Sequence, residues 1–222
     1  MKKLLLTLLS VTFLSFNTFA KKPTTVVIET EYGKIEMILY DNTPKHKENF
    51  IKLCKEHTLD GTLFHRVIPE FMIQGGDPNS KNAKPGEMLG NGDLGYKVDA
   101  EINDENYHKY GALAAARDND PTKASSACQF YIVVGKKFDE TALQNIANRT
   151  GKKYTDEQKA MYKTKGGTPH LDNNYTVYGE VTKGMDIVEK IVKEPRDKSD
   201  RPNKDIRMTR VYLKKKKFLG IF

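Results

Sequence analysis

Cysteine is scarce in this chain, which has only Cys54 and Cys128 among its 222 residues. Two cysteines cannot build the disulfide framework that holds small exported domains together. A chain of this length is expected to form one domain, or one domain with an insertion. We therefore expect two buried free thiols, although the sequence alone also allows one disulfide between them.

Motifs of metal and covalent chemistry are missing as well. The five histidines do not show the spacing of metal ligands, and the sequence contains no HExxH. The GxSxG motif that surrounds the nucleophile of many serine hydrolases does not occur either. These absences argue against a metalloenzyme and a hydrolase, and we expect no metal and no cofactor.

Basic residues are not gathered as they are in a nucleic-acid-binding protein. The formal net charge is +8, and lysines are interspersed with acidic residues except at Lys214–Lys217. Apolar residues follow this run, so a contact with a membrane surface or a partner is one interpretation of a tail over 214–222. A solvated tail is the simpler one. We expect no nucleic-acid partner.

A long apolar run occurs only at the N-terminus. Two lysines precede the mostly apolar stretch 4–16, and Thr18-Phe19-Ala20 provides a small-residue cleavage site. This order is typical of a secretory signal peptide. The alternative is a membrane anchor, but the run is shorter than the roughly 20 apolar residues that span a bilayer. We expect a signal peptide over 1–20 and an exported or periplasmic mature domain over 21–222, without a stable membrane span.

Alternation of apolar and polar residues predicts strands through most of the chain. A hairpin is expected over 25–40, and Thr43-Pro44 is typical of a helix start. Residues 111–117 suit either a helix start or a closely packed strand, and we favour the strand. The other expected elements are strands over 64–68, 71–73, 128–134, 175–181 and 206–213 and a helix over 183–192. Many strands with two isolated helices predict a closed antiparallel barrel capped at its ends.

One stretch, FHRVIPEFMIQGGD over 64–77, combines an arginine with aromatic, methionine and amide side chains. In an extended chain alternate residues share a face, so Phe64 is expected beside Arg66, and Met72 beside Gln74. A guanidinium near an amide and an apolar wall suggests a small pocket, because arginine is rarely buried without a partner. Considered alone, Arg66 would also suit the surface of a strand.

The same stretch is similar to the signature of the cyclophilin family of peptidyl-prolyl isomerases. Two further blocks follow in the family's order, ALAAARDNDPTKASSACQFYI at 112–132 and HLDNNYTVYGEV at 170–181. The resemblance covers about residues 25 to 213, apart from a polar segment over 138–168 with two helical patterns. It implies a mainly β fold, a closed eight-stranded antiparallel barrel capped by two α-helices. The polar composition of 138–168 predicts a helical surface insertion, and its position between Tyr131 and Leu171 suggests that it borders the groove.

The resemblance also implies an isomerase that acts on proline-containing polypeptides. Together with the expected signal peptide, it predicts an enzyme that assists exported proteins as they fold, and we expect a monomer. A peptide-binding chaperone or scaffold with little catalysis is the alternative on the same barrel. At the matching positions, the family's catalytic arginine is Arg66 and its supporting glutamine is Gln74. The implied substrate-binding residues are Phe71, Met72, Ala116, Arg117, Gln129, Tyr131, Leu171 and Tyr175.

Three positions depart from the best-known eukaryotic pattern. Tyr175 replaces a histidine at the pocket edge, His170 replaces a tryptophan linked to cyclosporin binding, and Tyr131 replaces a pocket phenylalanine. Many bacterial members resemble this chain in the first two positions. We therefore expect isomerase activity to be retained and cyclosporin to bind weakly.

Overall fold

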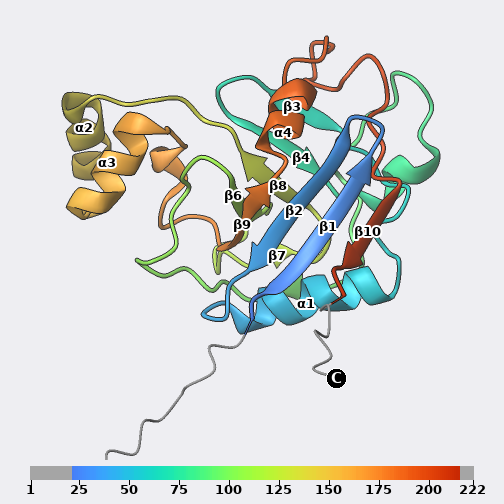
Figure 1. The fold of residues 1–222 in the computed structure, drawn as a ribbon, viewed down its shortest axis with the longest axis horizontal. Helices are drawn as coiled ribbons and strands as arrows, with labels where there is room; N and C mark the ends of the chain where they lie inside the picture. Colours follow the sequence, from blue (N-terminus) through green and yellow to red (C-terminus); the bar gives the residue numbers. More distant parts are fainter. Residues whose placement is uncertain (1–21, 216–222) are drawn as a thin grey trace, which may run out of the picture.

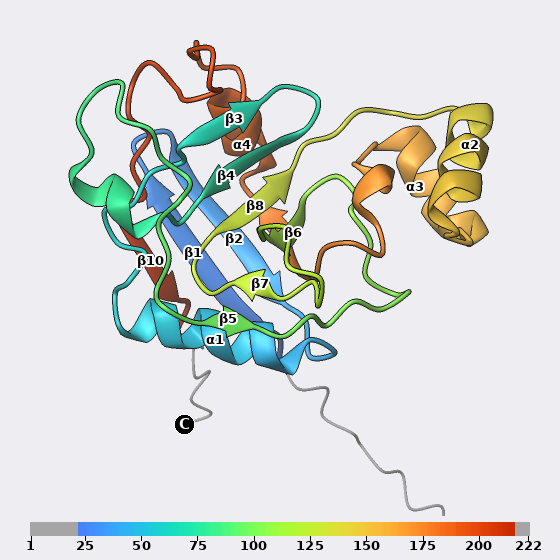
Figure 2. The ribbon, with the colours of Figure 1, turned by 180° about the vertical axis from the view of Figure 1, so that it is seen from behind.

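The structure, a computed structural model, describes residues 22–215. Across these residues, eight strands form one antiparallel sheet in the order β10-β1-β2-β9-β6-β8-β4-β3. The sheet curves so that β1, β2 and β10 lie on one side of the molecule, whereas β3, β4, β6 and β8 lie on the other (Figures 1 and 2). The strand bounds are β1 Thr24–Thr30, β2 Gly33–Leu39, β3 Arg66–Ile68, β4 Met72–Gly75, β6 Ala112–Ala115, β8 Phe130–Val133, β9 Val177–Lys183 and β10 Arg210–Leu213. A separate two-stranded sheet pairs β5 (Lys97–Val98) with β7 (Ser125–Ser126).

The sheet is an open half-barrel, so the expected closed barrel is wrong. Within the described chain β3 and β10 are the two edges of the sheet and do not pair with each other. The segments that precede them meet at an isolated bridge between Leu63 and Arg207, where backbone hydrogen bonds join 61–64 to 206–208. A break at Thr209 explains this geometry. The residues before it pair with the 61–64 segment, whereas the residues after it pair with β1.

Two of the four described helices close the ends of the half-barrel (Figures 1 and 2). Helix α1 (Pro44–Lys55) covers one end and α4 (Met185–Ile191) covers the other. Thr43 is the N-cap of α1, as expected, but its side chain makes no capping hydrogen bond to the described residues. The Glu101 carboxylate instead accepts the backbone N–H groups of Lys45 and His46, each at 2.9 Å. A negative charge near the N-terminus of a helix also interacts favourably with the helix dipole.

The larger apolar core fills the half-barrel between the sheet and these two helices. Phe50 and Leu53 of α1 share this core with Phe130 of β8 and Val188 of α4. Cys54 and Cys128 lie in the same core and are not bonded to each other, which confirms the expected free thiols. Burial raises the pKa of the Cys54 thiol to about 12.

A smaller apolar cluster covers the opposite face of β4, β6, β8 and β9. It consists of Met72, Ala112, Ala114, Tyr131, Val133 and Val177. Residues on β6 and β8 alternate between the two clusters, as the period of a strand requires. The alanines of β6 leave room on this outer face, and the candidate site described below lies there.

Residues 138–168 form the expected helical insertion, which extends to the side of the sheet in both ribbon views. It contains α2 (Glu140–Thr150) and α3 (Asp156–Thr164), and the short 3₁₀ helix η2 (Pro169–Leu171) follows it. Tyr162 is fully buried in an apolar cluster with Leu143 and Tyr107. At the neck of the insertion, a Cβ on Gly135 would lie only 2.2 Å from the Gly167 carbonyl oxygen. Only glycine allows this close backbone approach.

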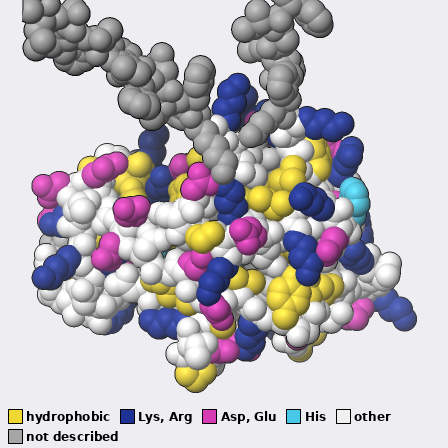
Figure 3. All heavy atoms as spheres, turned by 90° about the horizontal axis from the view of Figure 1, so that it is seen from below, with side chains coloured by type: hydrophobic (Ala, Val, Ile, Leu, Met, Phe, Trp, Pro, Cys, Tyr) yellow, Lys and Arg dark blue, Asp and Glu magenta, His cyan; other side chains and the backbone are white. Residues whose placement is uncertain are grey.

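The two ends of the described chain meet beside α1, where the Lys214 N–H donates to the Thr25 carbonyl at 2.9 Å. Figure 3 looks onto this end and shows lysine and arginine side chains interspersed with acidic ones rather than a basic stripe. None of the helices within residues 22–215 combines the length and the apolar character needed to cross a bilayer. The expected signal peptide over 1–20 lies outside the described residues, as do residues 216–222 of the expected tail.

Candidate active site

A cavity of about 210 Å³, named here the Arg66 cavity, opens on the outer face of β3, β4, β6 and β8. Nine of the ten predicted site residues line it, although they come from segments more than a hundred residues apart. The tenth, Gln129, lies beside it and lines an adjoining hollow of about 640 Å³, named here the side groove. The residues of the Arg66 cavity are Arg66, Phe71, Met72, Gln74, Ala116, Arg117, Tyr131, Leu171 and Tyr175.

A tight hairpin places Arg66 directly opposite Gln74. Strands β3 and β4 pair with Arg66 opposite Gln74 and Ile68 opposite Met72. Directly opposed residues on one face of an antiparallel pair are close enough for their side chains to interact. The expectation that Phe64 shares this face is wrong, because regular strand structure begins only at Arg66 and Phe64 turns into the inner core.

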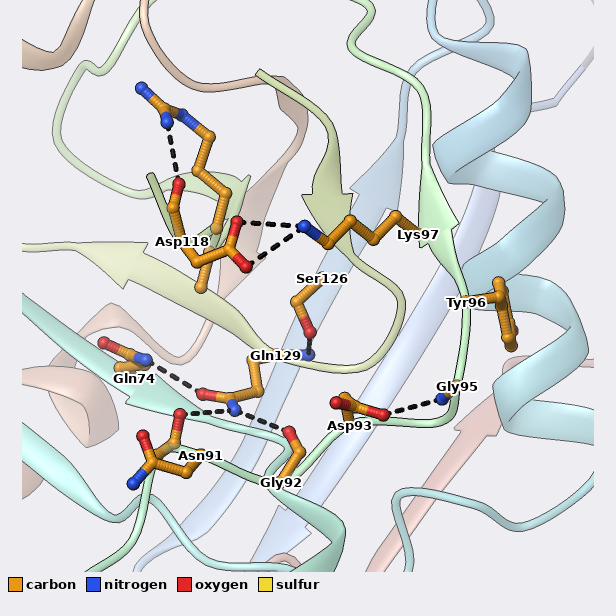
Figure 4. Close-up of a pocket in the computed structure, with 13 residues that line it drawn as sticks. Gln74, Asn91, Gly92, Asp93, Gly95, Tyr96, Lys97, Asp118, Ser126 and Gln129 are labelled. Atoms are coloured by element: carbon orange, nitrogen blue, oxygen red, sulfur yellow. Dashed lines mark hydrogen bonds and ion pairs between the residues drawn. The ribbon is translucent and has the colours of Figure 1, made fainter. Parts of the chain in front are cut away.

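A chain of amide hydrogen bonds determines how Gln74 faces Arg66. The Gln129 Nε2 group donates to the carbonyls of Gly90 and Gly92, at 2.9 and 2.8 Å. Gln129 Oε1 therefore faces Gln74 and accepts from its Nε2 at 3.1 Å, as Figure 4 shows. This leaves Gln74 Oε1 to accept from Arg66 Nη1 at 3.5 Å. A side-chain amide offers donors on one side and an acceptor on the other. The orientation of the Gln129 amide therefore determines that of the Gln74 amide.

The buried carboxylate of Asp77 fixes the loop at the start of this chain. It accepts the backbone N–H groups of Asn79, Gly90 and Gly92 at 2.8, 2.5 and 3.3 Å. A Cβ on Gly92 would lie 2.0 Å from an Asp77 oxygen, so a larger residue would displace the loop. Sequence reasoning missed Gly90 and Gly92. The only signal was the long glycine- and asparagine-rich region that contains them, since loops of that length are usually functional.

Arg66 also has an acidic partner that sequence reasoning missed. Asp200 Oδ2 lies 3.8 Å from Arg66 Nε, and Asp200 is held against β3 by the bond from the Val67 N–H to its carbonyl, 2.9 Å long. Asp200 also accepts from Arg196 Nε at 3.1 Å. Gln74 and Asp200 thus orient the Arg66 guanidinium from two sides. The side chain remains 42% exposed and lines the cavity. Nothing in the sequence relates Asp200 to a residue so far away.

Apolar and aromatic side chains form the rest of the cavity. Met72 and Tyr131 are buried at its floor, whereas Phe71, Leu171 and Tyr175 are half-buried around it. The Tyr131 and Tyr175 rings meet edge to face, with centroids 6.1 Å apart. Such a cavity suits a small apolar ring, with one cationic group at its edge.

Arg117 and Ala116 contribute to the cavity in different ways. The Arg117 guanidinium lies 4.7 Å from the centroid of the Tyr175 ring, and its Nε donates to the Asn174 carbonyl at 2.8 Å. Arg117 therefore supports the cavity wall with its side chain. The Ala116 N–H already donates to the Gln129 carbonyl at 3.0 Å, and its carbonyl accepts from Ser126 at 2.8 Å. A bound peptide could not use the Ala116 N–H without breaking that bond.

Elsewhere in the structure, three polar side chains are arranged like the catalytic triad of a serine hydrolase. His46 Nε2 lies 3.0 Å from Ser125 Oγ, and His46 Nδ1 lies 2.7 Å from Glu101 Oε2. A nucleophile must reach its substrate, but Ser125 is only 1% exposed. The arrangement instead fastens α1 to β7. Within the described range, no three His, Cys, Asp or Glu side chains gather closely enough to hold a metal ion.

Comparison with curated proteins finds relatives that share about a third of the residues. A protein from Staphylococcus epidermidis, named as a peptidyl-prolyl cis-trans isomerase, is 35% identical over 182 residues, which cover 82% of this chain and 87% of that protein. A Staphylococcus aureus protein with the same name is 34% identical over equal shares. A Streptococcus pyogenes protein named as a bifunctional phosphatase/peptidyl-prolyl cis-trans isomerase is 35% identical over 184 residues, but the match spans only 37% of its length.

Solved structures and the family comparison agree with these relatives. Two crystal structures of a cyclophilin type peptidyl-prolyl cis-trans isomerase from Cryptosporidium parvum have TM-scores of 0.61 and 0.62 and sequence identities of 24% and 25%. They cover 86% and 87% of this chain and 99% of each solved chain. Residues 25–213 match the family described as cyclophilin type peptidyl-prolyl cis-trans isomerase/CLD. This chain therefore belongs to the cyclophilin-type peptidyl-prolyl cis-trans isomerases.

Proposed function

We propose that Arg66 accelerates rotation about X-Pro peptide bonds by stabilising the twisted amide, and that the protein assists the folding of exported proteins. One observation carries the mechanism. Arg66 lies opposite Gln74 at a cavity that is otherwise walled by apolar and aromatic side chains. The Arg66 cavity would hold the proline ring, while Gln129 and the side groove would receive the peptide next to it.

The physical argument starts from the planar amide. Rotation about an X-Pro bond is slow because the resonance between nitrogen and carbonyl must be broken. In the twisted transition state the proline nitrogen becomes pyramidal and gains a lone pair, which the ground state does not offer. A guanidinium N–H that donates to this lone pair binds the transition state more tightly than the substrate, and this difference is catalysis. The mechanism requires no nucleophile, general base or cofactor.

The magnitude of this effect is within the reach of a fixed charged donor. Lowering the barrier by about 7 kcal/mol would accelerate rotation roughly 10⁵-fold. Met72 and Tyr131 would hold the proline ring while the preceding carbonyl rotates. Gln74 and Asp200 would limit the movement of the guanidinium, so that little reorganisation is needed when the amide twists.

The activity is tested with a protein whose refolding is limited by proline isomerisation, together with an exchange assay on a short X-Pro peptide. We expect catalytic amounts of residues 21–222 to accelerate both. An unchanged rate in both assays would show that the proposed activity is wrong. If aggregation of the refolding protein fell while both rates stayed the same, the result would support a peptide-binding chaperone instead.

The export proposal rests on the composition of residues 1–20. In a Gram-negative host that expresses the full chain, we expect the protein in the periplasmic fraction, with its N-terminus near Lys21. N-terminal sequencing of the fractionated protein provides the measurement. Recovery of the chain in the membrane fraction with residues 1–20 still attached would indicate an anchor. Recovery from the cytoplasm would contradict export.

A further inference from the structure

A buried line of hydrogen bonds connects the helical insertion with the floor of the Arg66 cavity. The Tyr162 hydroxyl of α3 donates to Asp172 Oδ2 at 2.7 Å. Asp172 Oδ1 lies 2.8 Å from His108 Nδ1, and His108 Nε2 lies 2.9 Å from the Tyr131 hydroxyl. All four side chains are at least 95% buried. Buried polar groups that satisfy one another in this way hold the side chains in one arrangement.

The direction of each bond follows from the carboxylate, which only accepts when it is ionised. Asp172 Oδ1 accepts the backbone N–H of His108 at 2.9 Å as well as its Nδ1–H. In the neutral imidazole, a proton on Nδ1 leaves Nε2 free to accept from the Tyr131 hydroxyl. The tyrosine hydroxyl is therefore satisfied inside the protein, and the ring itself lines the cavity. This explains how a tyrosine can occupy a position where an apolar ring is required.

The insertion also touches the chain on both sides of Leu171. The Tyr154 hydroxyl donates to the Pro169 carbonyl at 3.0 Å, and Lys152 Nζ lies 3.4 Å from Asn173 Oδ1. Leu171 and Tyr175, which line the cavity, belong to this same segment. The insertion is thus packed behind the cavity wall, and the buried line is its connection to the floor.

We propose that Tyr162, Asp172 and His108 are positioning residues that orient the Tyr131 ring for the proline of the substrate. The proposal rests on the proposed function of the Arg66 cavity. It gives the insertion a defined role, since Tyr162 supplies the last donor of the line and belongs to α3. Arg66 lies outside this line of hydrogen bonds. Breaking the line should therefore reduce peptide affinity more than it reduces the rate of rotation in the bound state.

The test is Tyr162→Phe, which removes one hydroxyl and keeps the ring. We expect the Kd of an X-Pro peptide, measured by NMR titration, to rise about three- to tenfold, the range of one buried hydrogen bond. The exchange rate of the saturated complex should change less than twofold. The ring nitrogen resonances of His108 should shift, because its carboxylate partner has lost a donor.

Tyr107→Phe is the matched control, because Tyr107 contacts Tyr162 edge to face in the same cluster, with centroids 5.5 Å apart. Its hydroxyl does not belong to the line, so we expect the peptide Kd and the His108 resonances to stay unchanged. An equal effect of both variants would indicate general loosening of the insertion and would overturn the proposal.

A double-mutant cycle with Tyr131→Phe separates positioning from a merely structural role. If Tyr162 acts through the Tyr131 hydroxyl, Tyr162→Phe should raise the Kd much less in the Tyr131→Phe background. Equal increases in both backgrounds would contradict the proposal. These measurements use binding and His108 resonances, so they remain informative even if the wild-type protein does not accelerate isomerisation. That outcome would reject the proposed function alone.

Discussion

Replacing Arg66 with alanine is expected to lower the rate of X-Pro rotation in the bound peptide by about 10²- to 10³-fold, the usual cost of removing a charged transition-state donor. Peptide affinity should change little, because the ground-state amide nitrogen has no lone pair for the guanidinium to meet. Exchange spectroscopy on a saturated peptide gives the rate, and titration of the same peptide gives the Kd. A loss confined to the rate is the signature of an interaction made only in the transition state.

Two further variants make the Arg66 experiment specific. Arg66→Lys keeps the positive charge but loses the planar guanidinium, so one side chain can no longer interact with both Gln74 and Asp200. An intermediate rate of rotation is expected. Arg196→Ala removes the other guanidinium that is bonded to Asp200 and should leave the rate unchanged. If Arg66→Ala were as fast as the wild type, the mechanism would be wrong although the isomerase activity would stand.

Acidification is expected to destabilise the fold through His65. This side chain is 4% exposed, and among the described residues neither ring nitrogen has a hydrogen-bond partner of good geometry. Burial lowers the pKa of His65 to about 4, even though the nearby Asp77 carboxylate and Leu63 carbonyl favour the protonated form. The unfolded chain binds this proton near the ordinary pKa of about 6.5, well before the folded chain does.

The loss of stability therefore falls within a defined pH window. The contribution of His65 is complete above about pH 6.5 and is lost progressively as the pH falls towards 4, because the unfolded state takes up the proton first. A pKa shift from 6.5 to about 4 corresponds to about 3 kcal/mol in the free energy of unfolding. Burial lowers the pKa of His46 too, which adds to the loss in the same direction.

Denaturant unfolding at several pH values between 7 and 4 measures this effect. His65→Leu should flatten the pH dependence, because leucine takes up no proton. His57→Gln is the control, since the His57 side chain is 62% exposed and its replacement should leave the profile nearly unchanged. If wild type and His65→Leu lost the same free energy over this range, the assignment to His65 would be incorrect.

Local patterns alone were sufficient for much of the fold, whereas the residues of the candidate site were predicted from the resemblance to the cyclophilins. Alternation along 128–134 predicted β8 and the opposite orientations of Phe130 and Tyr131, and the structure confirms both. The apolar runs over 64–68 and 71–73 predicted strands close to β3 and β4, whereas the pairing of Arg66 with Gln74 came from the structure. Short-range geometry of this kind is determined by neighbouring residues, so it can be read without knowing the rest of the fold.

Where distant segments meet, only the tertiary structure decided the outcome. Within the described chain the barrel is open because β3 and β10 are short edge strands that do not pair with each other, although the segments before them do meet. Contacts between separate segments are examples. They include the ion pair of Arg66 with Asp200, the bond from the Ala116 N–H to Gln129, and the line of hydrogen bonds from Tyr162 to Tyr131. The sequence by itself determined the family to which the chain belongs and, through that resemblance, which side chains are candidates for the site. Packing between distant segments determined how those side chains are oriented, because no local pattern fixes the partner of a buried polar group.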